Sequence, residues 1–339
     1  MTAKDIFRQT RPFCMAKLAI GGAMVLVLLV LLALLLGIGW IFGEVGMLIG
    51  LILWGGCIGA VRFAFMHYGG YLVKAGHVAV IAEAVKVGQV PANQVSVGKQ
   101  LVTERFLTSN VYFAVDKLVG AAIKQIQNGL QKVGNKLDFI PGMGAVTGLA
   151  KFFVDISLGY VDECCLGWTF YKKEQGAFQS AADGVVIYVQ NWKTLLKDAA
   201  KTMGKVLLIM VVMVLAIFIP VGLLFKLLKW PALAAFLFSC LIAWVVKFAF
   251  IDSYILCQMM TSYLQAAPGT PVTFDLYTKL CGLSASFKEL FQKGQAEDPR
   301  PVQAAPHNTT STAPGSFCGQ CGAKNEPGAR FCGSCGKPM

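Results

Sequence analysis

The stretch AMVLVLLVLLALLLGIGW, residues 23–40, decides the class of this fold. It lies inside an uncharged run from Leu18 to Gly43. About 20 apolar residues are enough for an α-helix to cross the hydrocarbon core of a bilayer. The run is too long for the core of a signal peptide and has no small-residue cleavage site. We therefore expect a retained membrane span.

Further apolar runs pair with the first into two hairpins. A second run follows Glu44 and reaches Val61, so the turn before it is short. A third extends from Val206 to Phe225, and a fourth from Ala232 to Val246 after the turn KLLKWP. The sequence therefore predicts an all-α, multi-pass membrane protein with at least four transmembrane helices.

The composition also favours a membrane protein. Hydrophobic residues make up 56% of the 339 residues, and only 14% are charged, whereas soluble proteins carry about 25%. The net charge of +12 suits contact with anionic lipid headgroups. The basic residues are scattered without an arginine-rich run, which argues against nucleic acid as the partner.

Basic residues around the first hairpin predict its orientation. They precede the first span and follow the second, at Lys4, Arg8, Arg11, Lys17, Arg62 and Lys74. The first hairpin turn contains none. The positive-inside rule then places both termini and the central region in the cytosol. Lys226 and Lys229 in the second hairpin turn oppose this orientation.

The two hairpins resemble each other. VRFAF at 61–65 matches VKFAF at 246–250, and in each half a proline and a lysine follow eight residues apart. These pairs are Pro91 with Lys99 and Pro271 with Lys279. Internal repeats are common in membrane transport proteins. We predict a duplication, with chance similarity of apolar sequences as the alternative.

The central region contains an amphipathic helix. Its apolar side chains recur at alternating four- and three-residue steps, which places them on one face. They are Val115, Val119, Ile123, Ile126, Leu130, Val133 and Leu137. Such a helix lies on the membrane, packs on the hairpins, or belongs to a cytosolic bundle; the sequence leaves these open.

Acidic residues on an apolar segment form a candidate polar membrane site. Asp155 and Asp162 are seven residues apart, so they share a helix face, and Glu163 lies beside them. Carboxylates in an apolar helix are costly inside a membrane and often functional, which suggests attraction of a small cation. The alternative is that they face water or pair with nearby lysines, namely Lys151, Lys172 or Lys173.

About a third of the chain resembles a known membrane family. The segments SAADGVVIYVQNWKTLLKDAAKTMGKVLLIMVV (180–212) and FAFIDSYILCQMMTSYL (248–264) are similar to the C-terminal membrane region of the choline transporter-like proteins. The resemblance implies that the protein moves or senses a small cationic amine, and it identifies no binding residue. That family has more spans than four, and a terminal cysteine-rich unit is not expected in it.

The C-terminal unit FCGQCGAKNEPGARFCGSCG (317–336) carries two C-x2-C pairs. Four thiolates satisfy the tetrahedral coordination of one zinc ion and leave no open position, so the metal is structural. The unit resembles the zinc-ribbon family over its whole length. Its predicted zinc ligands are Cys318, Cys321, Cys332 and Cys335.

These patterns favour two functions over an enzyme. No nucleophile–base pair or phosphate-binding glycine loop is evident, and the three histidines are not clustered with other ligands. One function is a transporter or channel-like protein for a small cationic amine. The other is a membrane-tethered scaffold or regulator that binds protein partners through the ribbon and the cytosolic helices. Both functions are compatible with a homo-oligomer.

The expected organisation has seven parts. They are a cytosolic N-terminus (1–17), hairpin 1 (18–66), an amphipathic and interfacial region (67–203), hairpin 2 (204–253), a cytosolic helical segment (254–294), a flexible linker (295–316) and the zinc ribbon (317–339).

Overall fold

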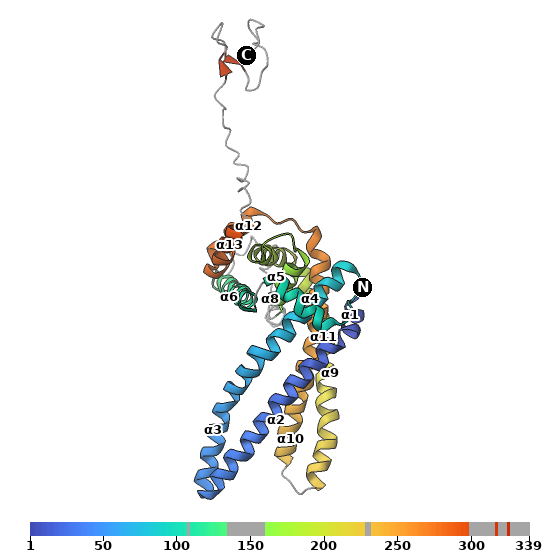
Figure 1. The fold of residues 1–339 in the computed structure, drawn as a ribbon, viewed down its shortest axis with the longest axis vertical. Coiled ribbons are helices and arrows are strands. Elements are labelled where there is room, and N and C mark those ends of the chain that lie inside the picture. Colours follow the sequence, from blue (N-terminus) through green and yellow to red (C-terminus); the bar gives the residue numbers. More distant parts are fainter. Residues whose placement is uncertain (107–108, 134–159, 228–231, 298–315, 318–323, 326–339) are drawn as a thin grey trace. The chain divides into compact units, whose positions relative to one another are not determined.

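The computed structural model describes residues 1–106, 109–133, 160–227, 232–297, 316–317 and 324–325 (Figure 1). The chain divides into two compact units, Met1–Pro299 and Arg300–Met339. The described part of the second unit is a short antiparallel pair, β1 (Ser316–Phe317) with β2 (Lys324–Asn325).

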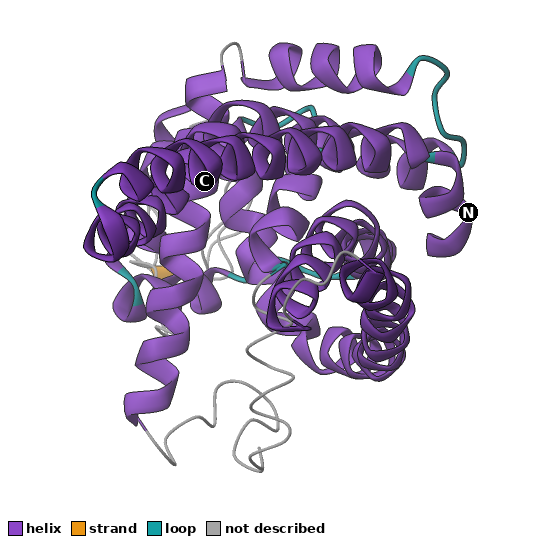
Figure 2. Cartoon of the chain, turned by 90° about the horizontal axis from the view of Figure 1, so that it is seen from below, coloured by secondary structure: helices purple, strands orange, loops and turns teal. Residues whose placement is uncertain are grey.

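The described elements of the first unit are all helices (Figure 2). In chain order they are α1 (Ala3–Gln9), α2 (Arg11–Ile41), α3 (Gly43–Ala64), the π-helix η1 (Phe65–Gly70), α4 (Tyr71–Val87), α5 (Gln94–Phe106), α6 (Ser109–Val133), α8 (Val161–Tyr171), α9 (Ala177–Leu227), α10 (Ala232–Val246), the π-helix η4 (Lys247–Ile251), α11 (Asp252–Ala266), the 3₁₀-helix η5 (Ala267–Gly269), α12 (Phe274–Leu283) and α13 (Ala285–Glu297). This confirms the predicted all-α class for the first unit.

Three helices among the described residues are long and apolar enough to cross a membrane. They are Arg11–Ile41, the continuous helix Gly43–Val87 and the helix Phe238–Gly269. The third predicted span falls within α9, where the apolar stretch Leu208–Leu224 is shorter. The structure therefore supports membrane association through three of the four predicted segments.

Glycines let α2 and α3 pack closely as a hairpin. The chain reverses at Gly43, whose φ of 73° lies in the left-handed region that glycine adopts without strain. A Cβ atom added at Gly50 would lie only 2.7 Å from the backbone oxygen of Leu35. Small residues at such contacts allow two apolar helices to approach until their backbones touch.

The second helix of each pair continues past the predicted ends of the hairpins at residues 66 and 253. The continuation passes through a π-helix in both cases, η1 between α3 and α4 and η4 between α10 and α11. Each π-helix lies at the end of a copy of the repeated motif: η1 begins at the last residue of VRFAF, and η4 covers the last four of VKFAF. Single π-turns are rare, and many occur at functional sites.

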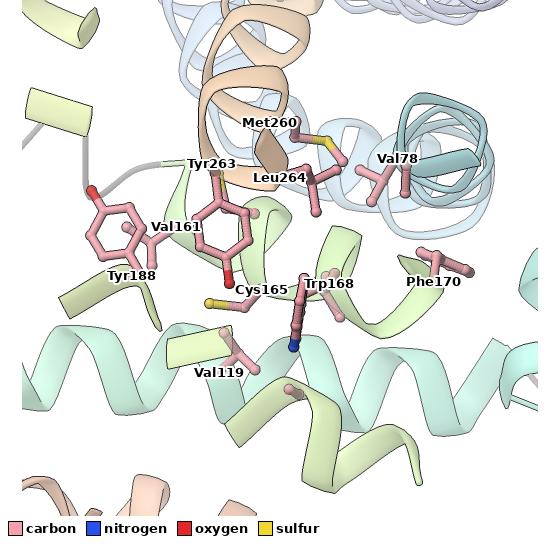
Figure 3. Close-up of a cluster of buried hydrophobic side chains, with 14 of the residues drawn as sticks. Val78, Val119, Val161, Cys165, Trp168, Phe170, Tyr188, Met260, Tyr263 and Leu264 are labelled. Atoms are coloured by element: carbon pink, nitrogen blue, oxygen red, sulfur yellow. The ribbon is translucent and has the colours of Figure 1, made fainter. Parts of the chain in front are cut away.

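The continued helices join a set of packed helices that we call the helical head: α4, α5, α6, α8, α11, α12, α13 and the first part of α9. Figure 1 shows α2 with α3, and α9 with α10, extending from this head on the same side. Its centre is α8, which contacts α4, α6, α9 and α11. Side chains of these helices, such as Val78, Trp168 and Tyr263, meet in the core that Figure 3 shows.

The predicted amphipathic helix corresponds to α6, and its apolar stripe is part of this core. Val115, Val119, Ile123 and Ile126 are buried, and α6 packs on α8, α9 and α13. The other members of the stripe lie outside the residues whose side chains are described. Of the arrangements that the sequence left open, the structure shows that α6 is one helix of a bundle.

Candidate functional site

The predicted acidic residues begin α8. Asp162 and Glu163 occupy its first turn, where the partial positive charge of the helix N-terminus favours carboxylates. Asp162 is half-buried, whereas the side chain of Glu163 is only 8% exposed. Asp155 lies outside the described residues, so the predicted face that it shares with Asp162 is not described.

Both carboxylates pair with Lys74 of α4. The Lys74 Nζ lies 2.6 Å from Glu163 Oε1 and 3.7 Å from Asp162 Oδ2. This partner differs from the nearby lysines considered from the sequence. Lys172 lies over the ring of Trp168 and Lys173 pairs with Glu83, whereas Lys151 is outside the described residues.

Helix α6 brings a third carboxylate and a tyrosine to the same place. Asp116 lies close enough to Lys74 and Glu163 for their charges to interact. Tyr112, which is only 1% exposed, is close to Asp116 and to the two carboxylates of α8. Its ring centroid lies 5.1 Å from that of Tyr71 on α4. We call Tyr71, Lys74, Tyr112, Asp116, Asp162 and Glu163 the acidic cluster.

The acidic cluster has more carboxyl groups than lysines. Three carboxyl groups lie around Lys74, and the exposed Lys117 also acts on Asp116. Burial raises the pKa of Glu163 to about 8, with Lys74 opposing the rise and Asp162 adding to it, so Glu163 is largely protonated at neutral pH. Burying unpaired charge costs several kcal/mol in the absence of a partner (roughly 3–5 kcal/mol). A cation that binds beside Glu163 would therefore favour the ionised form of this carboxyl.

Four oxygen atoms of the acidic cluster are buried without a hydrogen-bond partner among the described residues. They are the hydroxyls of Tyr71 and Tyr112, Asp116 Oδ1 and Glu163 Oε2. Buried polar atoms are nearly always paired in folded proteins. Two neighbouring phenol hydroxyls and one oxygen atom from each of two carboxyl groups, all without partners, therefore indicate a place where another group belongs.

A second buried polar cluster surrounds Lys17, which is only 5% exposed. Lys17 Nζ donates to Ser253 Oγ of α11 at 2.9 Å and lies 3.4 Å from Nδ1 of His77 on α4. The other ring nitrogen of His77 lies 3.0 Å from the hydroxyl of Thr10. Cys257 Sγ is 3.9 Å from the same nitrogen. We call Lys17, His77, Thr10 and Ser253 the lysine–histidine cluster.

Neither this second cluster nor the role of Lys74 was predicted from the sequence. Lys17 and Lys74 were interpreted as flanking charges of the spans, and His77 as isolated. Their partners come from segments far apart in the chain, so no local spacing could reveal them. The one available signal was the occurrence of single polar residues, such as Lys17 and His77, beside or within apolar stretches.

No group of three or more His, Cys, Asp or Glu side chains among the described residues is arranged to hold a metal ion. The acidic cluster is therefore not a preformed metal centre. The four predicted zinc ligands lie outside the described residues.

Comparison with known proteins identifies the end of the chain. Residues 317–339 match the family model of the zinc-ribbon domain, which confirms the predicted ribbon, and zinc-ribbon domains generally bind zinc. No curated protein and no solved structure matches the chain.

Proposed function

We propose that the protein is a transport-type membrane protein for a small organic ammonium cation, and that the acidic cluster holds the cation. One observation carries the proposal: three carboxyl groups lie around Lys74 in a buried place where two of their oxygen atoms lack partners. An ionisable group that is buried next to membrane-spanning helices is a candidate for ligand binding.

The proposed architecture has four spans in two duplicated hairpins, with both termini in the cytosol. Leu208–Leu224 of α9, which packs against α10, supplies the additional span. The repeated motif supports the duplication, because a π-helix begins within each copy. In both halves the next α-helix begins three residues after a proline, at Gln94 and at Phe274.

Contacts between the halves support the same proposal. The helix that follows the first π-helix, α4, packs on α11, which follows the second. The third equivalent pair, α6 and α13, also pack on each other, whereas among the described residues the pair between them, α5 and α12, does not have comparable contacts. Pairing of equivalent elements is what an approximate twofold arrangement produces, and many transporters are built from two repeats.

The resemblance to the choline transporter-like proteins favours the same class of ligand. It concerns residues 180–264, which supply α10, α11 and much of α9. None of the acidic cluster lies in the matching segments, so the site rests on the structure and not on the resemblance.

A membrane-tethered adaptor is the second candidate. The observation in its favour is the zinc ribbon in a unit of its own, Arg300–Met339. Four cysteine thiolates holding one structural zinc would stabilise a segment too small to fold by burial alone. Purified protein should then contain about one zinc per chain, and a Cys318→Ser, Cys321→Ser variant should lose it.

The test of the proposed function is ligand binding by the full-length protein in detergent. The thermal midpoint should rise with small ammonium salts, because a ligand of the folded state stabilises it by about 2.7 kcal/mol at a hundredfold excess over Kd. Proteoliposomes should take up the labelled cation. Asp116→Asn should weaken both signals.

Asp275→Asn is the matched control. Asp275 pairs with Lys279 on the exposed side of α12, so its loss removes a carboxylate without touching the acidic cluster. A protein that responds to no ammonium salt and transports none would contradict the proposal, and co-purifying protein partners would then favour the adaptor.

A further inference from the structure

We infer that the acidic cluster selects an ammonium group that carries N–H donors, such as a primary amine, over a quaternary ammonium group. This inference rests on the proposed function and specifies the chemistry of the ligand's charged end.

The groups without partners in the cluster are hydrogen-bonding oxygen atoms. Asp116 Oδ1 and Glu163 Oε2 are carboxylate acceptors, and the hydroxyls of Tyr71 and Tyr112 also accept through oxygen. A primary ammonium offers three N–H donors, whereas a quaternary ammonium offers none. Only the ligand with N–H groups satisfies these atoms.

The two tyrosine rings of the cluster contact neighbouring phenylalanine rings. Phe106 and Tyr112 meet at an interplanar angle of 84°, and Tyr71 and Phe113 meet at 76°. In such edge-to-face pairs the edge of one ring covers the face of the other. A quaternary ammonium needs an open ring face within about 6 Å, and the ring of Phe113 already has the ammonium of Lys117 over it, 5.1 Å from its centroid.

Lys74 shows how this place holds a primary ammonium. Its Nζ approaches Glu163 Oε1 at 2.6 Å and also reaches Asp162. Charge-assisted bonds of this kind are short and about twice as strong as neutral ones. A ligand ammonium would repeat the arrangement with the second oxygen of Glu163 and with Asp116.

The enclosed position of these oxygen atoms favours a ligand with a small ammonium group. The four oxygen atoms are sealed from solvent, so a ligand reaches them only when α4, α6 and α8 move apart. Each methyl group on nitrogen both removes a donor and enlarges the group that the closed helices must enclose. Affinity should therefore fall from methylammonium to dimethylammonium to tetramethylammonium.

The experiment compares these three chloride salts at equal ionic strength with full-length protein in detergent, with sodium chloride as the reference. From concentration-dependent thermal midpoints we expect at least about a tenfold lower Kd for methylammonium than for tetramethylammonium, since one hydrogen bond to a charged group is worth about 1.5–3 kcal/mol. Tyr112→Phe, which keeps the ring, should narrow this difference. Tyr71→Phe tests the other hydroxyl if the first variant does not fold.

The outcomes separate this inference from the proposed function. Equal or tighter binding of tetramethylammonium overturns the inference and leaves the proposed function standing. A protein that responds to none of the ammonium salts overturns both. A midpoint that depends on pH but not on any amine means that protons alone balance the carboxylates, and this also overturns both.

Discussion

The two buried lysines, Lys17 and Lys74, have opposite surroundings. The hydrogen-bond partners of Lys17 are neutral, and none of the polar side chains of the lysine–histidine cluster is left without a partner. Lys74 is enclosed by carboxylates, and its neighbours include four oxygen atoms without partners. A saturated network fixes helices in place, whereas an unsaturated one is available to a ligand.

The hydrogen bonds around Lys17 have a single consistent direction. Because an ammonium only donates, Nδ1 of His77 accepts, and its other nitrogen carries the hydrogen. That nitrogen donates to the Thr10 hydroxyl, which in turn donates to the backbone oxygen of Ile6 at 2.9 Å. The chain of donors therefore ends at the last turn of α1, where a helix dipole favours positive charge.

The largest expected effect is from Lys74→Met. The substitution leaves Asp162, Glu163 and Asp116 buried without a counter-charge, which should destabilise the protein by about 3–5 kcal/mol. The thermal midpoint in detergent measures the change. Adding Glu163→Gln should restore part of the loss, and a double variant as unstable as Lys74→Met would contradict the electrostatic explanation.

The pH dependence of stability should be the second largest effect. The pKa of Glu163 is raised from 4.5 to about 8, so the folded state binds a proton that the unfolded state releases between these values. Stability is complete below pH 4.5 and falls as pH rises toward 8, by up to about 1.4 kcal/mol per pH unit. Thermal midpoints from pH 5 to 8.5 measure the slope, which Glu163→Gln should flatten.

Lys17→Met should have a smaller effect than Lys74→Met. It removes a buried ammonium whose hydrogen-bond partners are neutral and leaves Ser253 Oγ and His77 Nδ1 without this donor, at a cost of about 1–3 kcal/mol. Thermal midpoints of the two variants, measured side by side, test the comparison. A loss of stability as large as that of Lys74→Met would contradict the difference between the two clusters.

Thr10→Val should give the smallest change, about 1 kcal/mol, because it removes one neutral hydrogen bond while keeping the shape of the side chain. Ammonium binding should be unaffected, since Thr10 belongs to the saturated cluster. Reduced binding in this variant would show that the two clusters are coupled.

Local patterns in the sequence predicted the elements well. The apolar run from Leu18 to Gly43 corresponds to the membrane part of α2, and the stripe of α6 is buried as its spacing indicated. The spaced cysteines predicted the zinc ribbon that the family model matches. Each of these signals lies within one short segment, so no long-range contact was needed to recognise it.

The acidic cluster could be predicted only in part. Asp162 and Glu163 stood out because carboxylates are rare in apolar segments. Lys74, Asp116 and Tyr112 did not, because their proximity depends on how α4, α6 and α8 pack. The same applies to His77, whose partners on α2 and α11 are brought to it by the helices that continue beyond the predicted hairpins.

The π-helix η1 links the two clusters through helical phase. A π-turn takes one more residue than an α-turn, and one residue rotates everything after it by about 100° in an α-helix. Lys74 and His77 both follow η1 on α4. Deleting one residue from η1 would turn both side chains away from their partners together. This one-residue insertion therefore sets the direction in which α4 presents Lys74 to α8 and His77 to α2.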